Sequence, residues 1–231
     1  MLRGAALLWV RLIRFAFHLL YNQFAFIYDL VSKVVSLGAW RCWQRSALLH
    51  IPPPDSGIVL EIAHGTGDLQ LDLSAGGWRS VGLDLSASMG KIASAKLRRA
   101  AAPCRLVRGR SQRLPFADGA FSAVISTFPS EFISAPETLR EVHRVLRNEG
   151  VFVIVPGARF TSGGAARAGV EVLYRITGQN IDGLNAVDAR LRDEFARFGF
   201  DAQIVEEPCP RSAASVIIAR KQAGQLGQGV L

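Results

Sequence analysis

From residue 58 onwards, short apolar segments alternate with amphipathic helical segments, and this alternation constrains the fold more than any other feature. Strands are predicted at residues 58–63, 80–85, 104–109, 121–128, 150–155, 202–206 and 213–220, and helices at 67–75, 86–101, 136–146 and 188–198. Strands that alternate with helices form a parallel sheet covered on both faces. Only Pro208-Cys209-Pro210 joins the last two strands, which is too short for a crossover helix, so they are expected to pair antiparallel at one edge. The expected fold is therefore a doubly wound α/β fold with a mostly parallel seven-stranded sheet and an antiparallel edge hairpin.

The first 33 residues are the most apolar part of the chain, but they are not expected to cross a membrane. Arg11 and Arg14 interrupt the apolar run, and residues 15–28 fall short of the roughly 20 residues that a bilayer requires. No small-residue cleavage site of a secretory signal follows the run. On a helix, the polar residues form a cationic stripe beside a wide apolar face, which is typical of a helix that lies at a membrane surface. Packing on the domain or on a second subunit is the alternative.

The prolines of residues 51–57 end this helical region, because proline cannot continue a helix. We therefore expect an N-terminal amphipathic helical region (1–50), a globular domain (51–221) and a polar, glycine-rich, disordered tail (222–231). Residues 157–180 lie between two predicted elements and are expected to form a mobile loop and a short helix over the carboxyl ends of the strands.

Positive charge is concentrated in one part of the chain, whose formal net charge is +8. Between residues 85 and 117 there are eight Lys or Arg residues and no Asp or Glu. Such a run is either a solvated face or a surface for an anionic partner. No aromatic residue lies between Trp78 and Phe116, so a platform for stacking bases is not expected, and lipid is favoured over nucleic acid. The oligomeric state is not predicted.

The three cysteines and four histidines are too few and too scattered to predict a disulfide framework or a metal site. Cys42, Cys104 and Cys209 are expected to be structural or incidental. This cysteine usage favours a reducing, cytoplasmic setting. If the N-terminal helix binds a membrane, it would do so from the inner face of the cell membrane.

Residues 58–72, IVLEIAHGTGDLQLD, have the pattern of a strand that leads into a nucleotide-binding turn and a helix. A dinucleotide fingerprint requires a third glycine, and Gln70 stands at that position. Asp84, at the end of the next strand, can accept both hydroxyls of a ribose in either case. Glu61 precedes the turn and can meet a cofactor that carries an ammonium and a sulfonium. The residues therefore favour S-adenosylmethionine over a dinucleotide.

The segments EIAHGTG, GLDLSASM, GRSQRLPFADGAFSAVISTF and ETLREVHRVLRNEGVFVIV resemble, in order and spacing, the successive motifs of class I S-adenosylmethionine-dependent methyltransferases, of the methyltransferase type 11 domain. The resemblance covers residues 58–155. Residues 22–44 are similar to an N-terminal element of the ubiquinone/menaquinone C-methyltransferases and the related phospholipid N-methyltransferases. The resemblance implies a Rossmann-like methyltransferase fold and S-adenosyl-L-methionine as cofactor.

The resemblance also implies a role at each matching position. The residues implied at the cofactor are Glu61, Ala63, Gly65 and Gly67 at the methionine portion, Asp84 at the ribose, Leu85, Met89, Ser111 and Gln112 at the adenine, Thr127 and Phe128 at the sulfonium, and Tyr28 as a closing residue. Ala63 replaces the usual first glycine, and its methyl group is a small intrusion that should be tolerated. Arg110 stands where the family often has an acidic residue for the adenine amino group, and arginine cannot accept that hydrogen bond.

Methyl transfer from a sulfonium is an in-line displacement in which the enzyme mainly supplies alignment. No catalytic base is assigned, because His64 is expected to be a turn residue. The expected function is methyl transfer to a small lipophilic acceptor, a quinone precursor or a phospholipid headgroup, at a membrane surface. A non-catalytic scaffold, which Arg110 would favour, and an enzyme for a soluble small molecule remain alternatives. Methylation of nucleic acid is disfavoured, because residues 126–130, STFPS, lack the Asn/Asp-Pro-Pro-aromatic tetrad of base-methylating enzymes.

Overall fold

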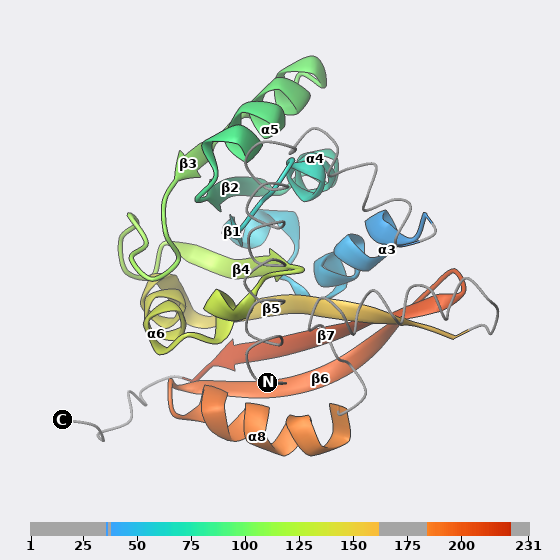
Figure 1. Ribbon diagram of the computed structural model, residues 1–231. Coiled ribbons are helices and arrows are strands. Elements are labelled where there is room, and N and C mark those ends of the chain that lie inside the picture. Colours follow the sequence, from blue (N-terminus) through green and yellow to red (C-terminus); the bar gives the residue numbers. More distant parts are fainter. Residues whose placement is uncertain (1–35, 37, 162–183, 223–231) are drawn as a thin grey trace, which may run out of the picture.

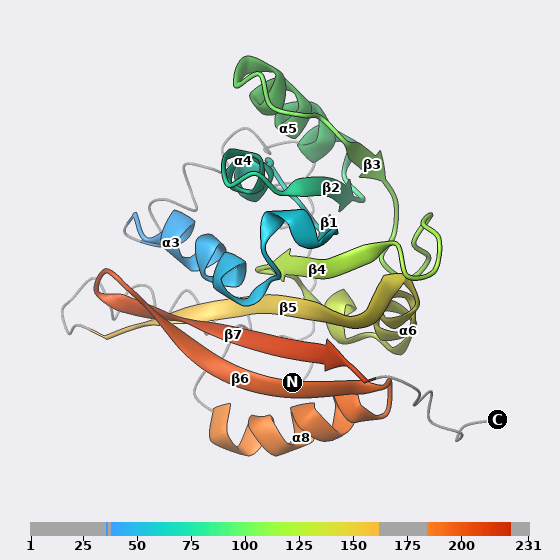
Figure 2. The same ribbon diagram turned by 180° about the vertical axis from the view of Figure 1, so that it is seen from behind.

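The computed structural model describes residue 36 and residues 38–161 and 184–222, which form a seven-stranded sheet with helices on both faces (Figures 1 and 2). The strands are β1 (Ile58–Ile62), β2 (Arg79–Asp84), β3 (Leu106–Arg108), β4 (Phe121–Thr127), β5 (Leu146–Phe160), β6 (Phe200–Cys209) and β7 (Ser212–Lys221). Their order across the sheet is β3-β2-β1-β4-β5-β7-β6. Strands β1 to β5 pair in parallel, whereas β7 is antiparallel to both β5 and β6. The predicted doubly wound fold and its edge hairpin are confirmed.

The helices cover both faces of the sheet. They are α3 (Trp40–Arg45), α4 (Asp68–Ala75), α5 (Ala87–Arg99), α6 (Pro136–Val145) and α8 (Leu184–Ala196), with short 3-10 turns η1 (Ser46–His50), η2 (Pro54–Ser56) and η3 (Glu131–Ser134). Apolar side chains of α3 and α4 pack on one face, and those of α6 and α8 pack on the other. Ser86 caps α5 as expected, since its Oγ accepts the N–H of Met89 at 3.3 Å.

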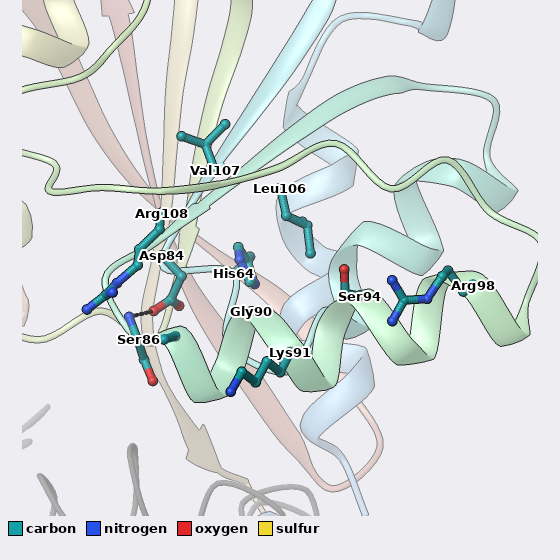
Figure 3. Close-up of a pocket in the computed structure, with 11 residues that line it drawn as sticks. His64, Asp84, Ser86, Gly90, Lys91, Ser94, Arg98, Leu106, Val107 and Arg108 are labelled. Atoms are coloured by element: carbon teal, nitrogen blue, oxygen red, sulfur yellow. Dashed lines mark hydrogen bonds between the residues drawn. The ribbon is translucent and has the colours of Figure 1, made fainter.

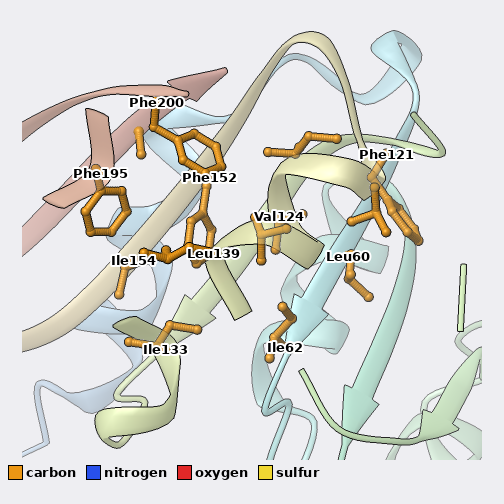
Figure 4. Close-up of a cluster of buried hydrophobic side chains, with 14 of the residues drawn as sticks. Leu60, Ile62, Phe121, Val124, Ile133, Leu139, Phe152, Ile154, Phe195 and Phe200 are labelled. Atoms are coloured by element: carbon orange, nitrogen blue, oxygen red, sulfur yellow. The ribbon is translucent and has the colours of Figure 1, made fainter. Parts of the chain in front are cut away.

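Two apolar clusters, one on each face, make up the core. Figure 4 shows the cluster on the α6 side, where Leu60 and Ile62 of β1 meet Val124 of β4. In the same cluster, the Phe152 ring lies 6.4 Å from that of Phe195, centroid to centroid. Alternate residues of β1 and β4 enter the opposite cluster, so both faces of these strands are buried. This double burial explains why both strands are nearly continuous apolar runs in the sequence.

Strand β5 continues past the predicted end at residue 155 and reaches Phe160. Its last part pairs with β7, with Gly157 opposite Ser215 and Phe160 opposite Ser212. The prediction of a loop from residue 157 is therefore wrong for residues 157–160, because the long β6–β7 hairpin provides a strand partner there. The rest of the predicted loop, the amphipathic helix of residues 1–33 and most of the tail lie outside the described residues.

A disulfide joins Cys42 of α3 to Cys209 at the end of β6, although the number and spacing of the cysteines predicted no disulfide framework. The disulfide also removes the support that these cysteines gave to a reducing setting. The two residues are 167 positions apart in the chain and meet because the turn of the hairpin extends alongside α3 (Figure 1). On the other side of α3, Asp72 of α4 accepts from Arg41 at 2.6 Å and from Arg45 at 2.8 Å. Helix α3 therefore packs on the sheet, and the domain division at residue 51 stays a prediction.

Candidate functional site

The site lies where the order of the strands reverses. Strands β1 and β4 are neighbours, but the chain continues from β1 to β2 on one side and from β4 to β5 on the other. At such a point the loops after the two strands diverge, and ligands of doubly wound sheets bind in the crevice between them. The strand ends place Ala63, Asp84 and Thr127 along this edge of the sheet.

The loop after β1 turns sharply and is tied to the end of β2. Ala63, Gly65 and Gly67 have φ angles of 60°, 54° and 84°, in the left-handed region. The N–H of Ala63 donates to the carbonyl of Leu83 at 2.7 Å, and that of Gly65 donates to Oδ2 of Asp84 at 2.9 Å. The loop and the Asp84 carboxylate therefore form one unit.

The glycines of this loop differ in what surrounds them. A Cβ added to Gly67 would lie 2.8 Å from the Cβ of Ala93, because the start of α4 touches α5 there. A Cβ added to Gly65 would meet no atom within 4 Å among the described residues. Gly67 thus serves packing as well as the turn, whereas Gly65 leaves open space above the loop, where a ligand can approach the backbone.

Ala63 stands in this turn where the resemblance led us to expect a glycine. We expected only a small steric intrusion from it. The structure instead locates the cost in the backbone, because left-handed φ disfavours any residue with a Cβ by roughly 1–2 kcal/mol.

Both carboxylate oxygens of Asp84 accept hydrogen bonds from backbone N–H groups. Its Oδ1 accepts the N–H of Ser86 at 2.8 Å while Oδ2 accepts that of Gly65, so the carboxylate is held from both sides. A carboxylate has about four acceptor positions, and two are therefore left for hydroxyls of a ligand. The next residue, Leu85, is 54% exposed, which is unusual for a large apolar side chain and leaves it free to lie against a ring.

A groove of about 410 Å³ opens from Asp84 along α5 and β3 (Figure 3). Its lining residues are His64, Asp84, Ser86, Ala87, Gly90, Lys91, Ser94, Arg98, Leu106, Val107 and Arg108. The His64 ring is bonded through Nδ1 to the carbonyl of Gly65 at 2.8 Å, the geometry of a turn residue. Burial lowers the pKa of His64, although the nearby Asp84 carboxylate acts in the opposite direction.

Glu61 lies beneath the loop and is only 1% exposed. Gln70 Nε2 donates to its Oε2 at 2.7 Å, and Ser80 in turn donates to Gln70 Oε1 at 2.9 Å. Burial raises the pKa of Glu61 to about 8, and the Asp84 carboxylate adds to this effect. At neutral pH the carboxyl group is therefore protonated. A role for Glu61 at the methionine portion of a cofactor stays a prediction.

The residues predicted to surround adenine differ in their burial. Met89 is fully buried on the inner side of α5 and does not line the groove, where Gly90 and Lys91 stand instead. Ser111 is 5% exposed, and its Oγ lies 3.1 Å from that of Thr138, whereas Gln112 is exposed. The spacing of four between Met89, Ala93 and Leu97 places all three on the buried face of α5. The roles of Met89, Ser111 and Gln112 at the adenine stay predictions.

The end of β4 meets α3, which supplies residues that the sequence did not point to. Phe128 follows Thr127 with a φ of 51° and stacks on Trp40, with ring centroids 4.0 Å apart and planes inclined by 21°. Gln44 Nε2 donates to Thr127 Oγ1 at 3.5 Å. Trp40 and Gln44 both belong to residues 22–44, the segment that resembles an N-terminal element of the methyltransferases. Nothing in their spacing indicated contact with β4. Tyr28 lies outside the described residues.

Comparison with known proteins agrees with this geometry. Residues 60–154 match the family model described as "Methyltransferase domain". The ubiquinone/menaquinone biosynthesis C-methyltransferase of Citrifermentans bemidjiense is 34% identical over 134 residues, which cover 55% of this chain and 57% of that protein. The demethylmenaquinone methyltransferase of Beutenbergia cavernae is 38% identical over 136 residues, covering 58% and 55% of the two chains. The match thus spans less than two thirds of the length of these curated relatives.

Solved structures share the fold. A Methanococcus maripaludis protein assigned to the S-adenosyl-L-methionine-dependent methyltransferases superposes with a TM-score of 0.61 at 18% identity, covering 91% of this chain and 96% of that one. The seven-stranded sheet described above is therefore the sheet of that fold. None of the helices in the described part of the chain is long and apolar enough to cross a membrane.

Proposed function

We propose that this chain is a class I methyltransferase that transfers a methyl group from S-adenosyl-L-methionine to a quinone precursor. Residues 60–154, which match the methyltransferase domain model, support this proposal. The observation that carries the proposal is the unit formed by the loop after β1 and the Asp84 carboxylate. The proposal also rests on the names of the relatives, since two that match over more than half of this chain methylate ubiquinone or menaquinone precursors.

The residues present suit this cofactor. Asp84 keeps two acceptor positions for the ribose hydroxyls, and the exposed Leu85 can cover the adenine. The open space at Gly65 leaves room for the methionine portion of the cofactor to lie close to the backbone. When bound, the cofactor supplies an electrophilic methyl carbon on a sulfonium. Thr127 and Phe128 would stand beside that carbon, and the protein's part is to align the acceptor with it.

We infer that the reaction takes place at a membrane surface, because quinone precursors are lipophilic. Residues 1–33 would provide the contact through their apolar face and cationic stripe. The cation-rich segment adds to this attraction, since Lys91, Arg98 and Arg108 are exposed at the edge formed by α5 and β3. A phospholipid headgroup is the second candidate acceptor, because the same surface would bring it to the site.

The decisive experiment is methyl transfer from labelled S-adenosylmethionine to a demethylated naphthoquinol with a short prenyl tail, compared with phospholipid vesicles. We expect labelled naphthoquinol. Calorimetric titration with the cofactor should accompany the assay. No binding at millimolar cofactor would contradict the proposal and would favour a non-catalytic scaffold, whereas binding with labelled lipid would change only the acceptor.

A further inference from the structure

Gln44 of α3 holds a buried hydrogen-bonding group that the fold does not use. The side chain is only 8% exposed, and its Nε2 reaches Thr127 Oγ1. Its Oε1 is buried and has no hydrogen-bond partner within the part of the chain that the structure describes. Buried carbonyl groups are nearly always paired, because an unpaired one loses its hydration without compensation.

The unpaired oxygen is not a consequence of a loosely placed helix. Helix α3 is tied to β6 through the Cys42–Cys209 disulfide and to β7 through Trp43, whose Nε1 donates to Ser212 Oγ at 2.9 Å. Arg41 ties it to Asp72 of α4. Because three elements hold α3, the Gln44 amide is fixed in place, which is what a ligand-binding group requires.

The surroundings of Gln44 indicate the kind of ligand. Thr127 lies at the end of β4, next to the loop after β1, because Glu61 of β1 and Ile125 of β4 are paired neighbours. On the same side, Trp40 and Phe128 stack and provide aromatic surface beside the amide. Phe128 adopts its left-handed φ despite its large side chain, and such strained residues concentrate at functional sites. An acceptor oxygen beside aromatic surface fits a flat ring that carries a hydroxyl group.

We propose that Gln44 positions the methyl acceptor by accepting a hydrogen bond from a hydroxyl on the acceptor's aromatic ring, which lies against Trp40 and Phe128. This inference rests on the proposed function and names the group that selects its substrate. In the reaction, the ring carbon next to the hydroxyl-bearing carbon forms a bond to the methyl carbon as the methyl–sulfur bond breaks. The sulfur keeps the bonding electrons, and the ring then releases a proton to solvent. Gln44 orients the ring and exchanges no proton.

The test compares two ligands in two proteins. The ligands are a prenylated 1,4-naphthoquinol and its dimethyl ether, which has the same ring but no hydroxyl hydrogen. We expect the wild-type protein to bind the naphthoquinol about tenfold more tightly than the ether, measured for both as a dissociation constant by calorimetry in the absence of S-adenosylmethionine. The variant Gln44→Met, which keeps the side-chain length, should lose this preference. Gln203→Met, an exposed glutamine of β6, is the matched control and should keep it.

A stability measurement separates a ligand-binding role from a structural one. Removing an unpaired buried carbonyl should leave the melting temperature of Gln44→Met unchanged or higher, while catalysis falls. If Gln44→Met is poorly folded, Gln44 is structural and the proposal is overturned. Gln44→Asn, which withdraws the whole amide by one methylene, should then keep the ligand preference and so confirm the structural role.

Two further results would overturn the proposal. One is an unchanged preference for the naphthoquinol in Gln44→Met. The other is a selective loss of affinity for S-adenosylmethionine, measured by calorimetry, which would assign the Gln44 oxygen to the cofactor's ammonium. A failure of the proposed function is distinguishable from both, because the wild-type protein itself would then bind no cofactor or methylate no naphthoquinol.

Discussion

The amide of Gln70 donates a hydrogen bond of 2.7 Å to the buried carboxyl group of Glu61. Gln70 occupies the position at which a dinucleotide-binding loop has its third glycine, so the residue that argues against a dinucleotide also supports the acid beneath the loop. A glycine there could neither pair with Glu61 nor link it to Ser80. The departure from the dinucleotide pattern is therefore part of how this site is built.

The raised pKa of Glu61 makes a prediction about stability and pH. The folded protein keeps this proton up to about pH 8, whereas the unfolded chain releases it near pH 4.3. The contribution of Glu61 to stability is therefore present below pH 4.3 and is lost as the pH rises toward 8. Relative to Glu61→Gln, the unfolding free energy of the wild type should decrease by a few kcal/mol between pH 5 and 8. Urea denaturation across this range measures the difference, and parallel pH profiles for the two proteins would contradict it.

Gly67 and Gly65 should respond differently to the same substitution. Gly67→Ala adds a left-handed alanine and a contact of 2.8 Å with Ala93, so we expect a loss of about 2–4 kcal/mol of unfolding free energy. Gly65→Ala has the backbone cost alone, about 1 kcal/mol, because its Cβ meets open space. Denaturant titration gives both values. Adding Ala93→Gly to Gly67→Ala should recover the steric part, and no recovery would mean that the contact is not the cause.

Ala63→Gly should stabilise the folded protein. It removes the left-handed strain of Ala63, and we expect a gain of about 1 kcal/mol in unfolding free energy. Cofactor affinity should be unchanged or higher, since the loop keeps its path. Thermal melting and calorimetric titration of the variant test both parts, and a lower melting temperature would show that the alanine methyl makes a favourable contact.

The disulfide between Cys42 and Cys209 should stabilise the fold and hold α3 in place. Cys42→Ser is expected to lower the unfolding free energy by about 2–4 kcal/mol, because a long loop is no longer closed in the unfolded chain. Cys104→Ser is the matched control, since this exposed cysteine is free. Adding dithiothreitol should reproduce the effect of Cys42→Ser in the wild type. If reductant changes nothing, the two thiols are not joined under the conditions of the assay.

The N-terminal segment makes a prediction that rests on its sequence. Deleting residues 1–20 removes Arg3, Arg11 and Arg14 with much of the apolar face, and should release the protein from anionic liposomes. Binding of the full chain should also weaken with added salt, which screens the cationic stripe. Flotation with anionic and neutral vesicles measures both effects. Unchanged binding of the shortened chain would assign the segment to packing on the domain or on a partner.

The sequence by itself determined the order of strands and helices along the chain and the position of the glycine-containing loop after β1. These features depend on local patterns: apolar runs buried on both faces, glycines at left-handed positions, and an acidic residue at the end of the second strand. The strand predicted at residues 58–63 and the one found at 58–62 agree almost residue for residue for this reason. The same local reasoning correctly predicted the edge hairpin, because a short connection excludes a crossover.

Only the tertiary structure decided which distant residues meet. Cys42 and Cys209 are 167 positions apart in the chain, and Gln44 and Thr127 are 83 positions apart. No periodic pattern in the sequence predicts either contact. Both follow from where α3 packs, which depends on the shape of the sheet and its hairpin. Met89 is buried against the domain by the packing of α5, and its role at the adenine stays a prediction. Proximity across a sheet edge is set by packing, and packing is a property of the whole chain.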